Sequence, residues 1–147
     1  MRTVGSRRLW LMPLLALAWS TPAGAEGRDR LGPVTHDATR KECGECHMAF
    51  QPGLLPAASW RQVMSGLSRH FGEDASLDAA RVADIERYLV AHAGAGDGAL
   101  PRITEQRWFV REHRRITAAT WARPDIKARS NCAACHPAAE RGLYEDE

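Results

Sequence analysis

Two short stretches of the sequence carry residue types that can do chemistry at a fixed spacing. Residues 43–47 read Cys-Gly-Glu-Cys-His, and residues 132–136 read Cys-Ala-Ala-Cys-His. In a Cys-x-x-Cys-His segment both thiols can add to the vinyl groups of one haem, and the histidine binds its iron. The two segments use all four cysteines, so the sequence predicts two covalently attached c-type haems. The predicted thioether residues are Cys43, Cys46, Cys132 and Cys135, and the predicted proximal iron ligands are His47 and His136.

Other uses of two Cys-x-x-Cys pairs are a structural zinc site or, in an exported chain, disulfides. Zinc does not explain why a histidine follows the second cysteine in both pairs, and it fits poorly with the 89 positions between Cys43 and Cys132. A redox protein with this motif would usually show alternating strands and helices, which are absent here. The pattern therefore favours haem over zinc or redox thiols.

Electron transfer favours a six-coordinate iron, so each haem needs a second axial ligand from elsewhere in the chain. Helical spacing from Trp60 to Phe71 places His70 on an apolar stripe. His113 lies beside Phe109 on the broad apolar side of a later predicted helix. We therefore expect His70 and His113 to be the distal iron ligands.

The remaining histidines and methionines are weaker candidates for these positions. His92 borders a glycine-rich segment, and His36 lies in a polar stretch before the first motif. Met64 is more typical of core packing than of ligation. Met48 is too close to His47 to reach the opposite face of the same haem.

The first 25 residues have the pattern of a cleavable secretory signal. A basic start leads into a short apolar run at residues 9–19, and Ala23-Gly24-Ala25 fits a cleavage site. The run falls short of the roughly 20 residues that span a bilayer, which favours cleavage over an uncleaved anchor. We expect residues 26–147 to be periplasmic, with no stable membrane insertion after cleavage.

Cleavage would leave 17 Lys and Arg against 18 Asp and Glu, a net charge of −1. The propionates of two haems would make the protein more acidic. The net charge of the whole chain therefore does not suggest a basic surface that binds nucleic acid.

The apolar pattern predicts an all-α fold: small and mostly helical, with long loops and no significant sheet. We expect one dihaem domain, with a lobe around the first haem at about 36–93 and a lobe around the second at about 101–144. Residues 94–98, Gly-Ala-Gly-Asp-Gly, read as the linker. The acidic end from Tyr144 is expected to be frayed. The first predicted helix begins near Ala57 or Ser59, with Ser59 as a candidate N-cap, and runs to about Phe71. The second runs from Ser76, also a candidate N-cap, to about Ala93, and the third from a Thr104 cap to about Ile116. A short helical turn is predicted at 132–136.

From about Lys41 to Tyr144 the chain resembles the small bacterial dihaem cytochromes c. The resemblance implies a periplasmic electron carrier with two bis-histidine, low-spin haems whose distal ligands fall on His70 and His113. It also implies a membrane cytochrome b and a small oxygen-binding monohaem cytochrome as partners. The segments that carry it are residues 43–50, Gly53-Leu54-Leu55-Pro56-Ala57, Ser59-Trp60, Leu67, His70-Phe71-Gly72, Arg102-Ile103-Thr104, Trp108-Phe109, Arg111-Glu112-His113 and residues 130–136.

These observations predict an electron-transfer protein and not an enzyme. Proximity along the chain pairs His70 with the haem of His47, and His113 with that of His136. The alternative is a haem enzyme or gas sensor, peroxidase-like or binding NO or O2, in which one iron has an open or displaceable axial site. Four histidines beyond the two motifs argue against an open site, because two irons need only two more ligands.

Overall fold

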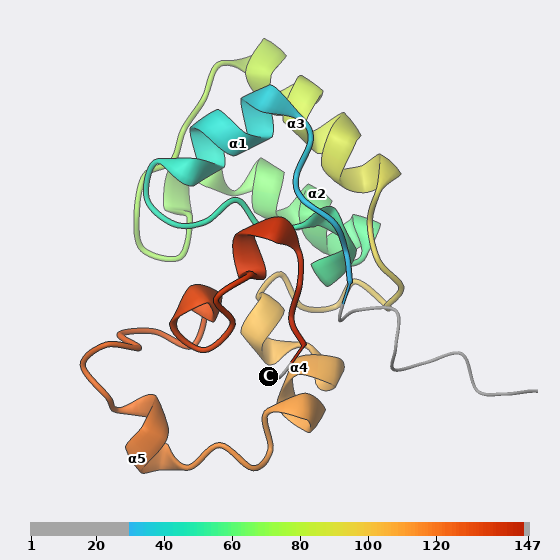
Figure 1. Ribbon diagram of the computed structural model, residues 1–147. Coiled ribbons are helices and arrows are strands. Elements are labelled where there is room, and N and C mark those ends of the chain that lie inside the picture. The colour runs from blue at the N-terminus through green and yellow to red at the C-terminus, as the bar shows by residue number, and fades with distance from the viewer. Residues whose placement is uncertain (1–29, 146–147) are drawn as a thin grey trace, which may run out of the picture.

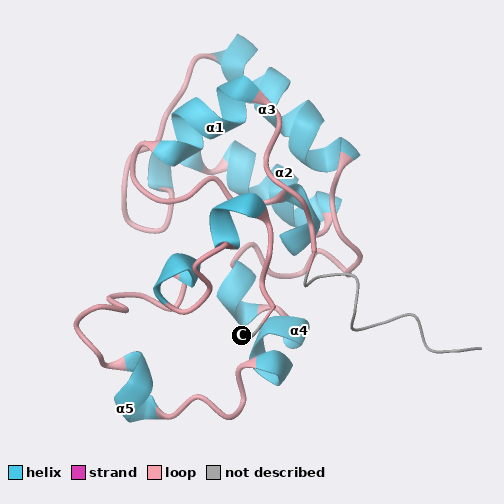
Figure 2. Ribbon diagram, viewed as in Figure 1, coloured by secondary structure: helices cyan, strands magenta, loops and turns pink. Residues whose placement is uncertain are grey.

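The computed structural model describes residues 30–145 of the chain, and the predicted signal peptide lies outside this range. Helices and 3-10 turns joined by long loops make up this part of the protein (Figure 1). Residues 30–145 contain no strand beyond isolated bridges, as Figure 2 shows. The predicted all-α fold without a significant sheet is confirmed.

Residues 36–93, for which we keep the name first lobe, contain three α-helices in the upper half of Figure 1. They are α1 (Asp37–Gly44), α2 (Ala57–Ser65) and α3 (Ala79–Ala91). Helices α2 and α3 pack against each other, and α1 lies against α3. The buried apolar cluster of this lobe consists of Leu55, Trp60, Met64, Ile85 and Leu89.

Residues 101–144, for which we keep the name second lobe, contain much shorter elements. Its α-helices are α4 (Arg107–Glu112) and α5 (Ala118–Trp121), and long loops join them to the 3-10 turns. The second attachment motif forms one of these turns, as the sequence predicted. The 3-10 turns of this lobe are Ile103–Glu105, Cys132–Ala134 and Ala139–Arg141.

The helix boundaries differ from the predicted ones for local reasons. Helix α2 ends at Ser65 because the chain leaves the helix at Gly66 and continues as a 3-10 turn. Ser59 does not cap this helix; its buried hydroxyl donates to the carbonyl of Leu100 at 2.7 Å. Asp78 caps α3 in place of Ser76, because its carboxylate accepts from a backbone N–H of the first turn at 2.9 Å.

The two lobes are joined by side chains far apart in the sequence. The buried Gln51 amide donates to the carbonyl of Ala139 at 2.9 Å. The Tyr144 hydroxyl donates to the Gln51 side-chain oxygen. Tyr144 is thus half-buried between the lobes, not frayed as the sequence suggested. The predicted linker is also packed on α2, since Gln62 donates to the carbonyl of Gly98 at 2.6 Å.

The last described residues pair with the first ones. The N–H of Leu31 donates to the carbonyl of Gly142 at 2.8 Å, and Arg30 forms an ion pair with Glu145 at 2.7 Å. Gly142 has a φ of +73°, and a Cβ there would lie 2.0 Å from the carbonyl oxygen of Gly32. This position therefore requires glycine. None of the helices within residues 30–145 has the length and apolar character to cross a membrane.

Candidate haem sites

The first site joins the end of one attachment motif to the turn after α2. The ring planes of His47 and His70 are nearly parallel, at 23°, with centroids 6.1 Å apart. His47 Nδ1 lies 2.7 Å from the carbonyl oxygen of Met48, so this nitrogen carries the proton. The Nε2 lone pair of His47 is then available to a metal.

A tight turn holds His70 at this position. His70 follows the 3-10 turn Leu67–Arg69, and the next residue, Phe71, has a φ of +54°. Non-glycine residues seldom adopt this left-handed conformation. The turn is closed by a hydrogen bond from the Glu73 N–H to the His70 carbonyl at 3.1 Å. His70 thus reaches His47 from a turn, not from the helical face that the sequence suggested.

The electrostatics around His70 favour a neutral imidazole. Burial lowers the pKa of His70, and the neighbouring charges of His47 and Arg102 lower it further. The guanidinium of Arg102 lies over the ring of Phe71, 4.1 Å from its centroid. A neutral ring keeps its nitrogen lone pair for a metal.

The second site pairs His113, directly after α4, with His136 at the end of the second motif. Their ring centroids lie 6.2 Å apart, and the planes are nearly perpendicular, at 88°. His113 Nδ1 donates to the carbonyl of Phe109 at 2.9 Å, and its ring stacks on that of Phe109 with centroids 4.0 Å apart. Tyr144 lies edge-on to His136, with centroids 5.6 Å apart. Two aromatic neighbours therefore orient this pair.

Both histidine pairs have the separation that a bis-histidine iron needs. An iron bound by two imidazole nitrogens at about 2 Å each holds the ring centroids about 6 Å apart. The observed 6.1 and 6.2 Å match this value. In each pair, one ring has its Nδ1 fixed by a backbone carbonyl, which leaves Nε2 to face the metal. The residues present fit two axially ligated haems.

The cysteines do not have the surroundings of a zinc or redox-thiol site. Burial raises the pKa of the Cys43 and Cys132 thiols to about 11 in each case. Thiols that exchange disulfides have lowered pKa values instead. Throughout residues 30–145 the cysteines are free, and His, Cys, Asp and Glu form no group of three that could hold a metal ion. The zinc and disulfide alternatives find no support in this geometry.

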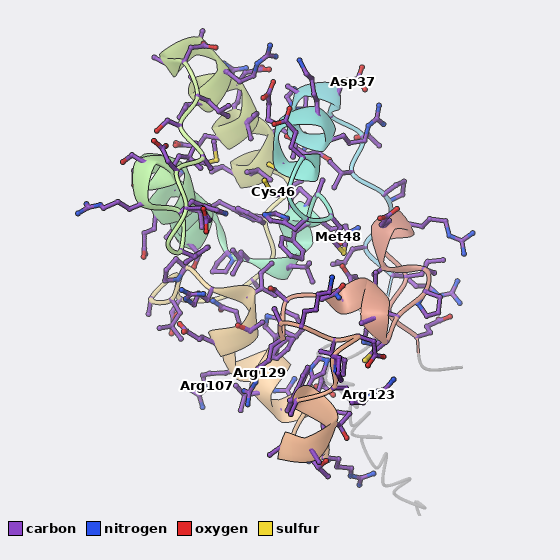
Figure 3. All side chains as sticks on the ribbon, turned by 90° about the vertical axis from the view of Figure 1, so that its left-hand side faces the viewer. Asp37, Cys46, Met48, Arg107, Arg123 and Arg129 are labelled. Atoms are coloured by element: carbon purple, nitrogen blue, oxygen red, sulfur yellow. The ribbon has the colours of Figure 1, made fainter. Side chains whose placement is uncertain are left out.

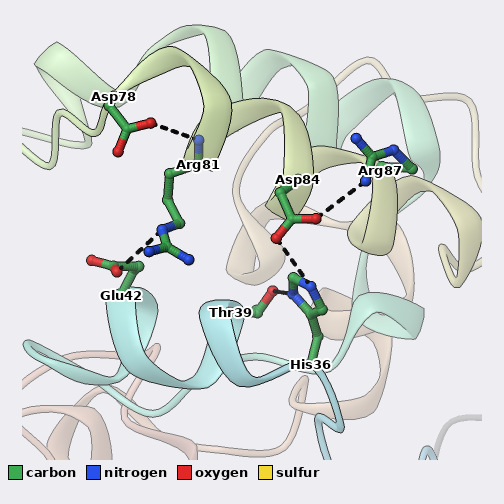
Figure 4. Close-up of polar contacts among 7 residues, drawn as sticks. All are labelled: His36, Thr39, Glu42, Asp78, Arg81, Asp84 and Arg87. Carbon is green, nitrogen blue, oxygen red and sulfur yellow. Dashed lines mark hydrogen bonds and ion pairs between the residues drawn. The ribbon is translucent and has the colours of Figure 1, made fainter.

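The other candidate ligands are engaged elsewhere. His36 Nδ1 lies 3.0 Å from Thr39 Oγ1, and its Nε2 lies 3.3 Å from the Asp84 carboxylate (Figure 4). These contacts place His36 between α1 and α3. The exposed His92 directs Nδ1 to its own helix, 2.9 Å from the carbonyl of Tyr88. His70 and His113 thus remain the histidines that lie beside the attachment motifs.

The methionines also have other positions. Met64 is buried in the core of the first lobe, and Met48 is half-buried next to His47. Sequence reasoning missed two residues that support the sites, Gln51 and Tyr144. No local pattern could reveal them, because their contact joins residues 93 positions apart.

Comparison with known proteins agrees with this geometry. The family model for dihaem cytochrome c matches residues 39–144. The chain belongs to the dihaem cytochrome c family. Its relatives carry two c-type haems, so the cofactors of this dihaem cytochrome are two haem c groups.

Solved structures of dihaem cytochromes c resemble it along most of their length. Two structures from Rhodobacter sphaeroides are 49% and 46% identical; each match covers 76% of this chain and 98% of the other, with a TM-score of 0.69. The dihaem cytochrome c of Shewanella baltica OS155 is 41% identical over 74% of this chain and 86% of its own, with a TM-score of 0.68. No curated protein matches the chain.

Proposed function

We propose that this dihaem cytochrome c is a periplasmic electron carrier in which two histidines close the axial positions of each iron. His47 and His70 serve the first haem, and His113 and His136 serve the second. The observation that carries the proposal is the pair of ring separations, 6.1 and 6.2 Å. Haem-based electron transfer is the activity of the family, and the closed coordination specifies how this member performs it.

The chain's own residues anchor and orient the haems in this proposal. Cys43 and Cys46 hold the first haem through thioether bonds, and Cys132 and Cys135 hold the second. When bound, each haem supplies a one-electron change between ferric and ferrous iron. The hydrogen bonds from Nδ1 of His47 and His113 to backbone carbonyls make both imidazoles more basic. Two histidine ligands per iron favour lower reduction potentials than a histidine–methionine pair.

Replacement of the distal histidines tests the coordination. His70→Ala and His113→Ala should each convert one haem from low-spin to high-spin and leave both haems covalently attached. The measurement is the optical spectrum of the purified protein, with pyridine haemochromogen analysis for haem content. His92→Ala is the matched control, because His92 is exposed and bonded to its own helix. Unchanged low-spin spectra in either distal variant would refute the assignment.

The interplanar angles of the two histidine pairs predict a second spectroscopic difference between the haems. Nearly parallel imidazole planes separate the iron orbitals that bind them, whereas nearly perpendicular planes leave these orbitals close in energy. The ferric protein should therefore show two low-spin signals in electron paramagnetic resonance, of which the more anisotropic belongs to the pair at 88°. That signal should disappear in His113→Ala and persist in His70→Ala.

We propose, from the resemblance to the family alone, that its partners are a membrane cytochrome b on one side and a small monohaem cytochrome on the other. The closed coordination leaves no open axial position, so the carrier turns over no substrate of its own. Carbon monoxide added to the ferrous protein should leave its Soret band unchanged. A prompt, large Soret change would favour the gas-sensor or haem-enzyme alternative for at least one haem.

A further inference from the structure

We propose that the second lobe is the docking surface for an acidic redox protein, because two of its cations, Arg114 and Arg129, line a cavity beside the proposed distal ligand His113. The inference rests on the proposed electron-transfer function and names the chemistry of one partner.

The two lobes have opposite charge. Residues 36–93 contain six Lys and Arg against eight Asp and Glu, a net charge of −2. Residues 101–144 contain nine Lys and Arg against four Asp and Glu, a net charge of +5. The near-neutral total therefore hides a strong asymmetry. A partner that comes within a Debye length, about 10 Å, responds to the nearer lobe more than to the whole protein.

Many cations of the second lobe remain available to a partner. Arg102, Arg111 and Arg123 form ion pairs with acidic residues nearby in the sequence. Within residues 30–145, no ion pair to a carboxylate involves the other cations of this lobe. They are Arg107, Arg114, Arg115, Lys127, Arg129 and Arg141.

Two of these cations lie at the second candidate site. Arg114 and Arg129 line one cavity of about 240 Å³ together with His113. The guanidinium of Arg129 lies 5.2 Å from the centre of the Trp121 ring, which also lines this cavity. In Figure 3, Arg107 and Arg129 lie over the same lobe, at the end of the molecule opposite Asp37. Positively charged side chains therefore lie on the side of the second site that contains His113.

Exposed apolar side chains accompany the charge. Val110 is 57% exposed and Ile116 is 38% exposed, and both line the cavity beside His113. A small apolar patch with a charged rim suits a weak, short-lived protein complex, in which charge guides approach and the apolar centre allows close contact. Such a contact would bring a second redox centre near the ligand.

An acidic protein fits this surface better than an anionic lipid surface does. Both would neutralise the same cations, but lipid headgroups beside His113 offer no donor or acceptor for an electron. The acidic first lobe also repels an acidic partner, so the charges orient it toward the second lobe.

Stopped-flow reduction of the fully loaded protein tests the proposal. The probe is flavodoxin hydroquinone, a small acidic electron donor. The rate constant for reduction by flavodoxin should fall steeply as the salt concentration rises, because opposite charges attract most strongly at low ionic strength. Arg114→Gln with Arg129→Gln, at the two cations that line the cavity beside His113, should lower the rate constant at least threefold at low salt and flatten its salt dependence. The matched control, Lys41→Gln with Arg61→Gln, removes two positive charges from the first lobe and should change it by less than half as much.

Equal effects of the two double variants, or a rate that is independent of salt, would overturn the docking proposal. Reduction by neutral lumiflavin semiquinone, measured on the same samples, separates this failure from failure of the carrier function. Normal reduction by the neutral donor leaves the electron carrier intact, whereas no reduction of either haem by either donor would refute the carrier itself. Vesicles of phosphatidylglycerol and phosphatidylethanolamine that capture the protein and block flavodoxin would assign the surface to a membrane and overturn the proposal.

Discussion

In the first lobe, five buried apolar side chains fill the space between α2 and α3, whereas residues 101–144 bury only Phe109, Ile126 and Ala139 among their apolar side chains. The helices differ in the same direction. Helix α3 has 13 residues, whereas α4 has six and α5 has four. Helices this short are not stable in water without tertiary contacts. The first lobe therefore has an apolar core of its own, whereas the second lobe depends on its haem for a core.

The strongest test of this comparison removes one haem at a time. Cys132→Ala with Cys135→Ala should abolish hydrogen-exchange protection throughout residues 101–141, because three buried apolar side chains are too few to hold them without the haem. Cys43→Ala with Cys46→Ala should leave α2 and α3 protected around the five-residue core. Hydrogen exchange read by mass spectrometry measures both variants. Equal loss of protection in the two lobes would contradict the comparison.

Truncation of a buried apolar side chain should lower the free energy of unfolding more in the first lobe than in the second. Ile85 is fully buried between α2 and α3, so Ile85→Ala should lower the free energy of unfolding by about 2–5 kcal/mol. Ile126 is as deeply buried but lies in a loop that can relax into the cavity. Ile126→Ala should therefore lower the free energy of unfolding by about 2 kcal/mol, the lower end of this range. Guanidinium denaturation followed by far-ultraviolet circular dichroism measures both, and a larger cost for Ile126→Ala would reverse the comparison.

The bridge between the lobes should have an intermediate effect. Gln51→Leu removes the partner of the Tyr144 hydroxyl and of the Ala139 carbonyl, and buried groups without partners cost about 1–3 kcal/mol each. Tyr144→Phe removes one hydrogen bond and should cost about 0.5–1.5 kcal/mol. Thermal unfolding followed in the Soret band should report both losses. If Tyr144→Phe were the more damaging variant, the hydroxyl would have a role that this bridge does not describe.

Removal of a helix cap should give the smallest difference in stability between the two lobes. Asp78→Ala removes the cap of α3 and should cost about 0.5–2 kcal/mol. Thr117 caps α5 through a hydrogen bond from the Thr120 N–H at 3.1 Å. Because α5 has only four residues, Thr117→Ala should change global stability less than Asp78→Ala does. Chemical denaturation of both variants side by side provides the measurement, and a reversed order would show that α5 supports more than its own turn.

Much of the candidate site could be predicted because its signals are local. Each attachment motif spans five residues, and its chemistry requires that spacing. His70 was selected from its place on an apolar helical face, yet it reaches His47 from a turn after Gly66. Position along the chain was enough to select the residue, although the helix ended earlier than predicted.

The contacts between the lobes could not be predicted in this way. Gln51 and Tyr144 meet because the whole chain folds back on itself, and neither neighbourhood has a periodicity that records it. Helix α1 also escaped prediction. Thr39 is its only buried side chain, so its sequence lacks the apolar stripe by which helices are recognised.

The tight contact at Gly142 has a consequence for the order in which the protein assembles. Gly142 packs against Gly32, and Tyr144 reaches Gln51, so the residues that close the two lobes follow both attachment motifs along the chain. A chain made from its N-terminus presents all four thiols before this closing segment exists. Haem attachment can thus precede the contacts that Gly142 and Tyr144 make with the N-terminal part of the chain.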